Sequence, residues 1–349
     1  MKEDIQLNVP LLRKRVPNLT TAAKSVGLRP ATVSNLCTGK ISLGKAEVRT
    51  LVSLASLADC TVDELIIRKG GGEMIETGIK VMDFFAPIVK GGRIGLVARQ
   101  GMGQLVVLTE VFYRLKKKGF RTIFLANSTD NSIADVLTET DFHTSCVYYA
   151  FEKLKEFRQE GEIILGIDRS IYLSETFHEL EEKLTEDGGD AITYAIVDTS
   201  GDAVDEEMPY GPLDTLWDFD MELAVKHNFP AVHPLVSTST ILEGLEAGSR
   251  HLETQSKAKK MIRRYKELKF FVRHRGLNSL SDRDQQLYSR GEKLEAYFTQ
   301  PFYVAEDFTN IKGESVPLDV TIKNVEHIMT GKVDSLESDK LRYIGELPA

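Results

Sequence analysis

The spacing of apolar residues changes at three consecutive glycines, Gly70 to Gly72. Before them the apolar positions follow a helical period, with few β-branched runs. After them short apolar runs typical of strands alternate with a helical segment. We predict strands at Arg93–Val97, Thr122–Ala126 and Ile192–Val197, and a helix at Val106–Lys117. Such alternation indicates an α/β domain with a mainly parallel sheet. From about Gly244 the pattern becomes helical and highly charged.

The composition is that of an ordinary globular protein, with 42% hydrophobic and 28% charged residues among 349. No apolar run approaches the ~20 residues that a membrane-spanning helix needs. The first residues contain acids and no apolar segment, so we expect no signal peptide, no membrane insertion and a cytoplasmic location. The three cysteines form no CxxC pair, and we expect no metal site.

Charge is unevenly distributed along the chain. Residues 1–70 contain 11 Lys and Arg against 6 Asp and Glu, although the whole chain carries a net charge of -8. The first part is therefore basic and the remainder acidic. A basic module on an acidic body is compatible with a polyanionic partner for the first part, although an excess of this size also arises by chance.

The segment from Thr20 to Lys40 has the features of two helices joined by a tight turn. Ala23 is small enough for a close helix contact, Gly27 suits the turn, and Val33 supplies an apolar lock on the second helix. Pro30 suits the first turn of that helix, because its missing N–H has no helical partner to lose.

These features resemble the lambda-repressor-like (Cro/CI, or Xre) helix-turn-helix family, from about Leu11 to Ile67, including the run Thr61–Leu65. The resemblance implies that the helix from about Pro30 to Cys37 enters the major groove of double-stranded DNA. The predicted base contacts are Ala31, Thr32 and Asn35, and the predicted phosphate contacts are Lys24, Arg29 and Lys40. The alternative is a helical module that contacts protein instead of DNA.

The second part of the chain resembles the F-type ATP synthase beta subunit. The resemblance starts with ETGIKVMDFFAPIVKGGRIGL at Glu76, recurs at Phe229–Ser239, Met261–Leu268 and Gln300–Thr309, and extends to about Gly345. It implies a RecA-like domain with a phosphate loop after the first long strand. The N-terminal β-barrel of that family is absent, and the helix-turn-helix segment stands in its place.

The phosphate loop departs from the pattern GxxxxGK[ST] at three positions. Ala98 replaces the first Gly, Gln104 replaces the Lys, and Leu105 replaces the Ser or Thr. The Lys normally reaches the β- and γ-phosphates, and the hydroxyl ligates magnesium. Gln104 is neutral and Leu105 cannot bind a metal. Of the loop, Arg99, Gly101, Gly103 and Gln104 could still contact a nucleotide weakly, as could Asp198 after the strand that ends at Val197.

Other positions that the resemblance assigns to catalysis have also changed. Thr129 stands at the position of the glutamate that orients water, Asp202 at that of an arginine for the γ-phosphate, and Thr240 at that of another arginine. Asp198 matches the magnesium-linked aspartate. Loss of positioned cations from phosphoryl transfer costs orders of magnitude in rate. We therefore assign no catalytic residue.

Three phenylalanines, Phe229, Phe302 and Phe308, match family positions that surround adenine. These rings could still bind the base of ATP or ADP weakly. Alternatively, they are core residues of the fold. The basic stretch Ser249–Arg275 could contact DNA, but acids occur beside it, so we predict a solvated helix face.

The sequence thus predicts an all-α helix-turn-helix domain at 1–69, a Gly-rich linker at 70–75, a degenerate α/β RecA-like domain at 76–243 and a C-terminal helical region at 244–349. We expect a DNA-binding regulator whose large domain is a scaffold, an oligomerisation platform or a nucleotide sensor. It would form a homo-oligomer or assemble with a related ATPase-like chain. The alternatives are a divergent ATPase or ring subunit, and a structural ring component whose first module binds protein.

Overall fold

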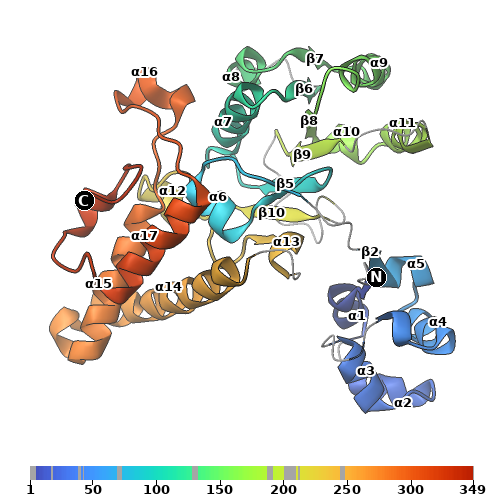
Figure 1. Cartoon of the computed structure of the whole chain (residues 1–349), viewed down its shortest axis with the longest axis horizontal. Coiled ribbons are helices and arrows are strands. Elements are labelled where there is room, and N and C mark those ends of the chain that lie inside the picture. The colour runs from blue at the N-terminus through green and yellow to red at the C-terminus, as the bar shows by residue number, and fades with distance from the viewer. Residues whose placement is uncertain are drawn as a thin grey trace. The chain divides into compact units, whose positions relative to one another are not determined.

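The computed structural model describes residues 5–16, 19–37, 41, 43–68, 73–127, 133–186, 192–199, 210, 213–243 and 248–348. The chain divides into two compact units, Met1–Gly72 and Glu73–Ala349. Each unit has its own hydrophobic core, and each is described by itself (Figure 1).

The first unit is mainly helical but is not all-α. A two-stranded antiparallel sheet pairs Ile5 with Arg68 and Leu7 with Ile66, which joins the two ends of the unit. The sequence prediction missed this pair, because strands of three residues far apart in sequence leave no periodic signal. The elements are β1 (Ile5–Leu7), α1 (Val9–Arg15), α2 (Leu19–Ser25), α3 (Pro30–Cys37), the 3-10 helix η1 (Leu43–Lys45), α4 (Val48–Leu57), α5 (Val62–Leu65) and β2 (Ile66–Arg68).

The second unit is built on a seven-stranded sheet with the order β11-β10-β5-β9-β8-β6-β7, in which only the β10–β11 pair is antiparallel. Met74 and Ile75, which the prediction placed in the linker, form a strand of a separate two-stranded sheet. The strands are β3 (Met74–Ile75), β4 (Ile88–Val89), β5 (Arg93–Val97), β6 (Arg121–Leu125), β7 (Phe142–Thr144), β8 (Ile163–Asp168), β9 (Thr193–Val197), β10 (Thr215–Asp218) and β11 (Thr238–Ser239).

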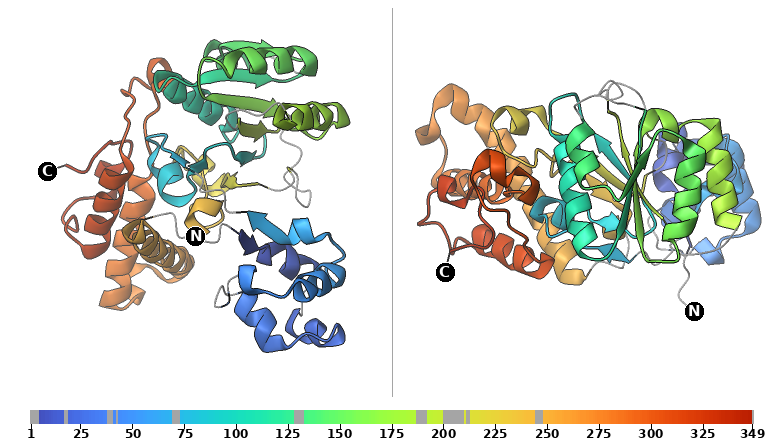
Figure 2. Two further views of the ribbon diagram at one scale, coloured as in Figure 1. Left: turned by 45° about the vertical axis from the view of Figure 1, so that its right-hand side comes forward. Right: turned by 90° about the horizontal axis from the view of Figure 1, so that it is seen from above.

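Helices cover both faces of the large sheet (Figure 2). Alternate residues of each strand point to opposite faces, so Ile196 and Val197 of β9 belong to different hydrophobic clusters. Parallel strands buried on both faces are mostly apolar, as Ile94–Val97 of β5 and Ala195–Val197 of β9 are. The helices on and beside the sheet are α6 (Lys80–Phe85), α7 (Gln104–Lys117), α8 (Ala134–Thr138), α9 (Val147–Phe157), α10 (Arg169–Tyr172), α11 (Glu175–Glu186), α12 (Met221–Val225) and α13 (Thr240–Glu243).

The C-terminal part is helical, as predicted, and packs on one side of the sheet unit. Its longest helix runs for 27 residues and lies against the next long helix, which returns toward the sheet. The elements are α14 (Ser249–Arg275), η4 (Leu277–Ser279), α15 (Asp282–Tyr297), η5 (Tyr303–Ala305), α16 (Glu306–Thr309), α17 (Leu318–Thr330) and η6 (Ser338–Leu341).

Candidate functional site: a phosphate loop without its cation

The loop between β5 and α7, where the sequence analysis expected a phosphate loop, contains two glycines with left-handed backbone angles. Gly101 and Gly103 have φ angles of 83° and 87°, in the left-handed region where a side chain would be strained. Gly103 is the residue from which α7 starts, and its carbonyl accepts a hydrogen bond from Val107 N at 3.0 Å. These two glycines therefore still set the turn from strand to helix.

The side chains of the loop and of the first turn of α7 do not include the groups that bind phosphate and magnesium. Gln104 is only 4% exposed, and Leu105 packs against the main hydrophobic cluster. Ala98 and Met102 are buried, and the backbone N–H of Arg99 points to the sulfur of Met102 at 3.2 Å. The first turn of α7 thus offers no cation and no hydroxyl to a bound anion.

Acidic side chains end the strands on either side of this loop. β5 lies between β9 and β10, which lead into Asp198 and end at Asp218. The next strand, β8, ends at Asp168. The sequence reasoning identified Asp198 but missed Asp168 and Asp218, because the strand order that places them at one edge is a tertiary property.

Two of these carboxylates have identifiable surroundings. Asp168 is buried and accepts hydrogen bonds from the backbone N–H groups of Ser170 at 2.9 Å and Thr199 at 3.2 Å. Burial raises the pKa of Asp218, and the neighbouring Asp220 raises it further. An edge with three acids repels the phosphates of a nucleotide unless cations compensate. No group of three or more metal-ligating side chains occurs among the described residues.

The three phenylalanines do not form one aromatic pocket. Phe302 is buried in the main cluster, whereas Phe308 on α16 is 82% exposed. Phe229 is half-buried, and its ring would lie 3.7 Å from a Cβ atom built on Gly103. Of the three, Phe229 is the one whose ring lies beside Gly103.

Two further predicted positions of this site, Thr129 and Asp202, lie outside the described residues. Arg99 is exposed on the loop, and Thr240, the first residue of α13, is also exposed.

A second polar cluster joins α14 to the loop after β10. Lys266 Nζ donates to Asp220 Oδ2 at 3.1 Å and lies 3.0 Å from His233 Nε2. The Nδ1 atom of His233 accepts from the backbone N–H groups of Leu235 and Val236, both at 3.1 Å. Burial and Lys266 both lower the pKa of His233, and Asp220 opposes this shift. Because each charge has a partner, we assign this cluster a structural role.

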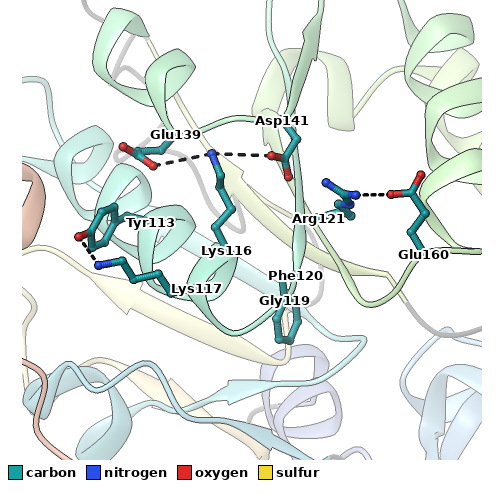
Figure 3. A pocket seen from close by; sticks show the side chains of 9 residues that line it. All are labelled: Tyr113, Lys116, Lys117, Gly119, Phe120, Arg121, Glu139, Asp141 and Glu160. Carbon is teal, nitrogen blue, oxygen red and sulfur yellow. Dashed lines mark hydrogen bonds and ion pairs between the residues drawn. The ribbon is translucent and has the colours of Figure 1, made fainter.

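A cavity of about 570 Å³ lies at the opposite edge of the sheet, where α7 ends and β6 begins (Figure 3). Lys116 lies 3.9 Å from Glu139 and 3.7 Å from Asp141, and Arg121 pairs with Glu160. The positive and negative charges of this cavity balance, so its walls select no anion. The remaining lining residues are Tyr113, Lys117, Gly119 and Phe120.

In the first unit, α2 and α3 pack through the residues that the sequence indicated. Ala23 and Val33 are buried between them, and Gly27 has a φ angle of 73° in the turn. Of the predicted DNA contacts, three are exposed and two are half-buried: Lys24, Arg29 and Ala31 are exposed, and Thr32 and Asn35 are half-buried. Lys40 lies outside the described residues.

Within the part of the chain that the structure describes, no helix has the length and apolar character required to cross a membrane.

Comparison with known proteins supports the architecture of the larger unit. No protein-family model matches the chain. Among solved structures, the chain is similar to "a unique ATP synthase subunit NeqB from Nanoarcheaum equitans", with a TM-score of 0.59 and 15% sequence identity over 75% of this chain and 77% of that chain. In total 410 solved chains match, so the fold is widespread and does not by itself select an activity. At this identity the likeness shows the fold: an α/β architecture shared with an ATP synthase subunit.

Proposed function

We propose that residues 73–349 act as a non-hydrolysing relative of ATP synthase subunits, which works by assembling with other chains rather than by turning over ATP. The observation that carries this proposal is the first turn of α7. There the lysine position is a buried glutamine, Gln104, and the metal-ligating position is an apolar side chain, Leu105. A phosphoryl group in transfer needs compensating positive charge, and this loop supplies none.

The resemblance to ATP synthase subunits supports assembly as the remaining role. The structural neighbour is itself described as an ATP synthase subunit. A domain that keeps such a fold while losing its chemistry can still present the surfaces through which subunits associate. It can also serve as a scaffold or as a weak nucleotide sensor.

The test uses the purified full chain. We expect no phosphate release from ATP and magnesium above the protein-free blank, ATP binding by calorimetry no tighter than millimolar, and a particle mass above that of the monomer by light scattering. Rapid hydrolysis that disappears in Asp198→Ala would establish the divergent ATPase instead. A monomer at all concentrations, alone or with a co-expressed ATPase-like chain, would contradict assembly.

We further propose that the first unit binds double-stranded DNA through α3. The packing of α2 on α3 around Ala23 and Val33, with the turn at Gly27, supports this second function. It leaves Lys24, Arg29 and Ala31 exposed. One such module makes few contacts, so assembly through the larger unit would raise its avidity for DNA with repeated sites.

A salt series of duplex binding tests this proposal. Lys24→Ala should weaken binding to all sequences and flatten the salt slope by about 1, whereas Asn35→Ala should relax sequence preference. Arg49→Ala removes an equal charge from an exposed position of α4 and should leave affinity unchanged. The absence of binding to any duplex at low salt, with a protein partner retained by the first unit, would favour the structural ring component.

A further inference from the structure

Helix α14 has one face that packs and one that does not. Its buried residues recur every three or four positions, as Ala258, Ile262, Tyr265 and Leu268 show. This spacing places them on one side of the helix, toward α15 and the sheet unit. The opposite side faces solvent and carries both aromatic and basic residues.

Two adjacent aromatic rings lie on that solvent-facing side, near the end of the helix. Phe270 is 64% and Phe271 48% exposed, and their ring centroids are 6.1 Å apart. The ring of His274 lies 4.7 Å from that of Phe270. Figure 1 shows this end of α14 at the end of the helical region that is farthest from the sheet. Single exposed apolar residues are common, but adjacent exposed rings indicate a contact surface.

Cations without acidic partners accompany these rings. Along α14, Lys257 pairs with Glu253 at 2.6 Å, and Arg264 with Glu267 at 3.0 Å. Within the described residues, Lys260, Arg263 and Arg275 have no carboxylate at ion-pair distance.

The helical period aligns these cations with the rings. Arg263 follows Lys260 by three positions, Phe270 follows Arg263 by seven, and Arg275 follows Phe271 by four. We name Lys260, Arg263, Phe270, Phe271 and Arg275 together the α14 stripe.

We propose that the α14 stripe is a sequence-independent contact for single-stranded nucleic acid. Lysine and arginine neutralise successive phosphates, and exposed rings stack on bases that are free of a partner strand. A duplex offers phosphates but no free base faces, so the rings distinguish the two forms. The charge of the stripe also contrasts with the acidic remainder of this unit, which disfavours a nucleic acid elsewhere on it. This inference does not depend on the function proposed for either unit above.

The experiment measures anisotropy of a labelled oligothymidine, about 20 nucleotides long, titrated with the full chain at several salt concentrations. Lys260→Glu combined with Arg263→Glu should weaken binding at least tenfold. Replacing both by Ala should reduce the salt slope by about 1.4, because each cation on a single strand contributes about 0.7. Phe270→Ala with Phe271→Ala should weaken binding about tenfold or more without changing that slope.

The matched control is Lys257→Ala, which removes a cation of the same helix that already has an acidic partner. It should change affinity less than twofold. All these positions are exposed or lie on the solvent-facing side, so circular dichroism melts of every variant should match the parent chain.

Three results would overturn the proposal. One is no binding of oligothymidine at low salt. Another is equal loss in Lys257→Ala and in the stripe variants. The third is competition by a duplex of equal length as effective as competition by the single strand, since that would leave the rings without a role. Stripe-dependent binding to vesicles of anionic lipid or to an acidic peptide, without binding to the oligonucleotide, would likewise assign the surface to a different partner.

Discussion

The first turn of α7 and its next two turns differ in whether they contain charged side chains. In the first turn, Gln104 and Leu105 stand where a nucleotide-binding enzyme needs a cation and a hydroxyl. In the second and third turns, Glu110 and Arg114 form a buried ion pair of 2.7 Å. The same helix therefore lacks these groups in its first turn and contains a charged pair in its core-facing part.

Arg114 is the centre of a buried polar network that joins three distant segments. It donates to the backbone carbonyls of Gly78 at 3.0 Å and Glu314 at 2.7 Å. Gln300 donates to the same two carbonyls, at 2.8 and 2.7 Å. Glu110 in turn accepts from the backbone N–H of Tyr303 at 3.2 Å. Each buried charge has several partners, which offsets the cost of desolvation.

This difference shows which changes the fold tolerates. A glutamine where a lysine is expected removes an interaction with a ligand and buries no charge, because Gln104 is neutral. Removing one member of the buried network leaves a desolvated charge without a partner, which is among the most destabilising single changes. The segment that begins at Glu76 therefore contributes to the stability of the fold through the carbonyl of Gly78, and its presence does not by itself indicate catalysis.

The largest expected effect is that of Arg114→Ala. It leaves Glu110 buried and unpaired, so we expect the free energy of unfolding to fall by about 3–5 kcal/mol. The measurement is urea denaturation followed by circular dichroism. Lys257→Ala removes the equivalent member of an exposed pair with the same spacing and should cost about 0.5 kcal/mol or less. Similar losses in the two variants would show that the network does not stabilise the unit.

A pH dependence should come from Lys80, which is fully buried in the same region. Its Nζ donates to the carbonyl of Ile344 at 2.6 Å and lies 4.2 Å from the centre of the Tyr297 ring. Burial lowers the pKa of Lys80 to about 7, and Glu314 opposes this shift.

The sign follows from proton binding. Between pH 7 and the unfolded pKa of 10.5, the unfolded chain binds a proton at Lys80 that the folded chain does not. This group therefore makes stability rise with pH across that window, by about 1.4 kcal/mol per unit at most. Urea melts at pH 7, 8 and 9 should show the rise in the parent chain and its absence in Lys80→Met. An identical rise in both would assign it to other groups.

A smaller effect is expected at Gly78, whose carbonyl belongs to the network. Its φ angle is 74°, and a Cβ atom there would lie 2.1 Å from Ser315 Oγ. Gly78→Ala should cost about 2 kcal/mol from backbone strain and displacement of its neighbours. Gly119 also has a positive φ angle, 91°, but a Cβ atom there would have no neighbour within 4 Å. Gly119→Ala should therefore cost only about 1 kcal/mol, from backbone strain alone. Thermal melts of the two variants separate strain from crowding.

The smallest effect is expected from introducing the lysine and threonine of the phosphate-loop pattern at positions 104 and 105. Gln104→Lys with Leu105→Thr adds a cation and a hydroxyl to the first turn of α7, and should tighten ATP binding about tenfold by calorimetry. Hydrolysis should stay absent, because Thr129 and Asp202 are unchanged. Val106→Lys adds an equal charge at an exposed position of the same turn and should not alter affinity. Recovery of turnover in the double variant would show that the remaining changes are tolerated.

The sequence by itself determined the elements with strong local signals. The predicted strand Arg93–Val97 coincides with β5, and the helix after the phosphate loop begins two residues earlier than expected, at Gln104. The turn at Gly27 and the burial of Ala23 and Val33 were also predictable from the sequence. Helical and strand periods are local properties, and the loss of the loop's cation depends only on residue identity.

Only the tertiary structure decided which of these residues lie together. Strand order brought Asp168, Asp198 and Asp218 to one edge of the sheet. The packing of the C-terminal part buried Phe302 and left Phe308 exposed. The network around Arg114 joins groups up to 222 positions apart in the chain. Such contacts follow from how the elements pack, and packing depends on the whole chain at once rather than on any local pattern.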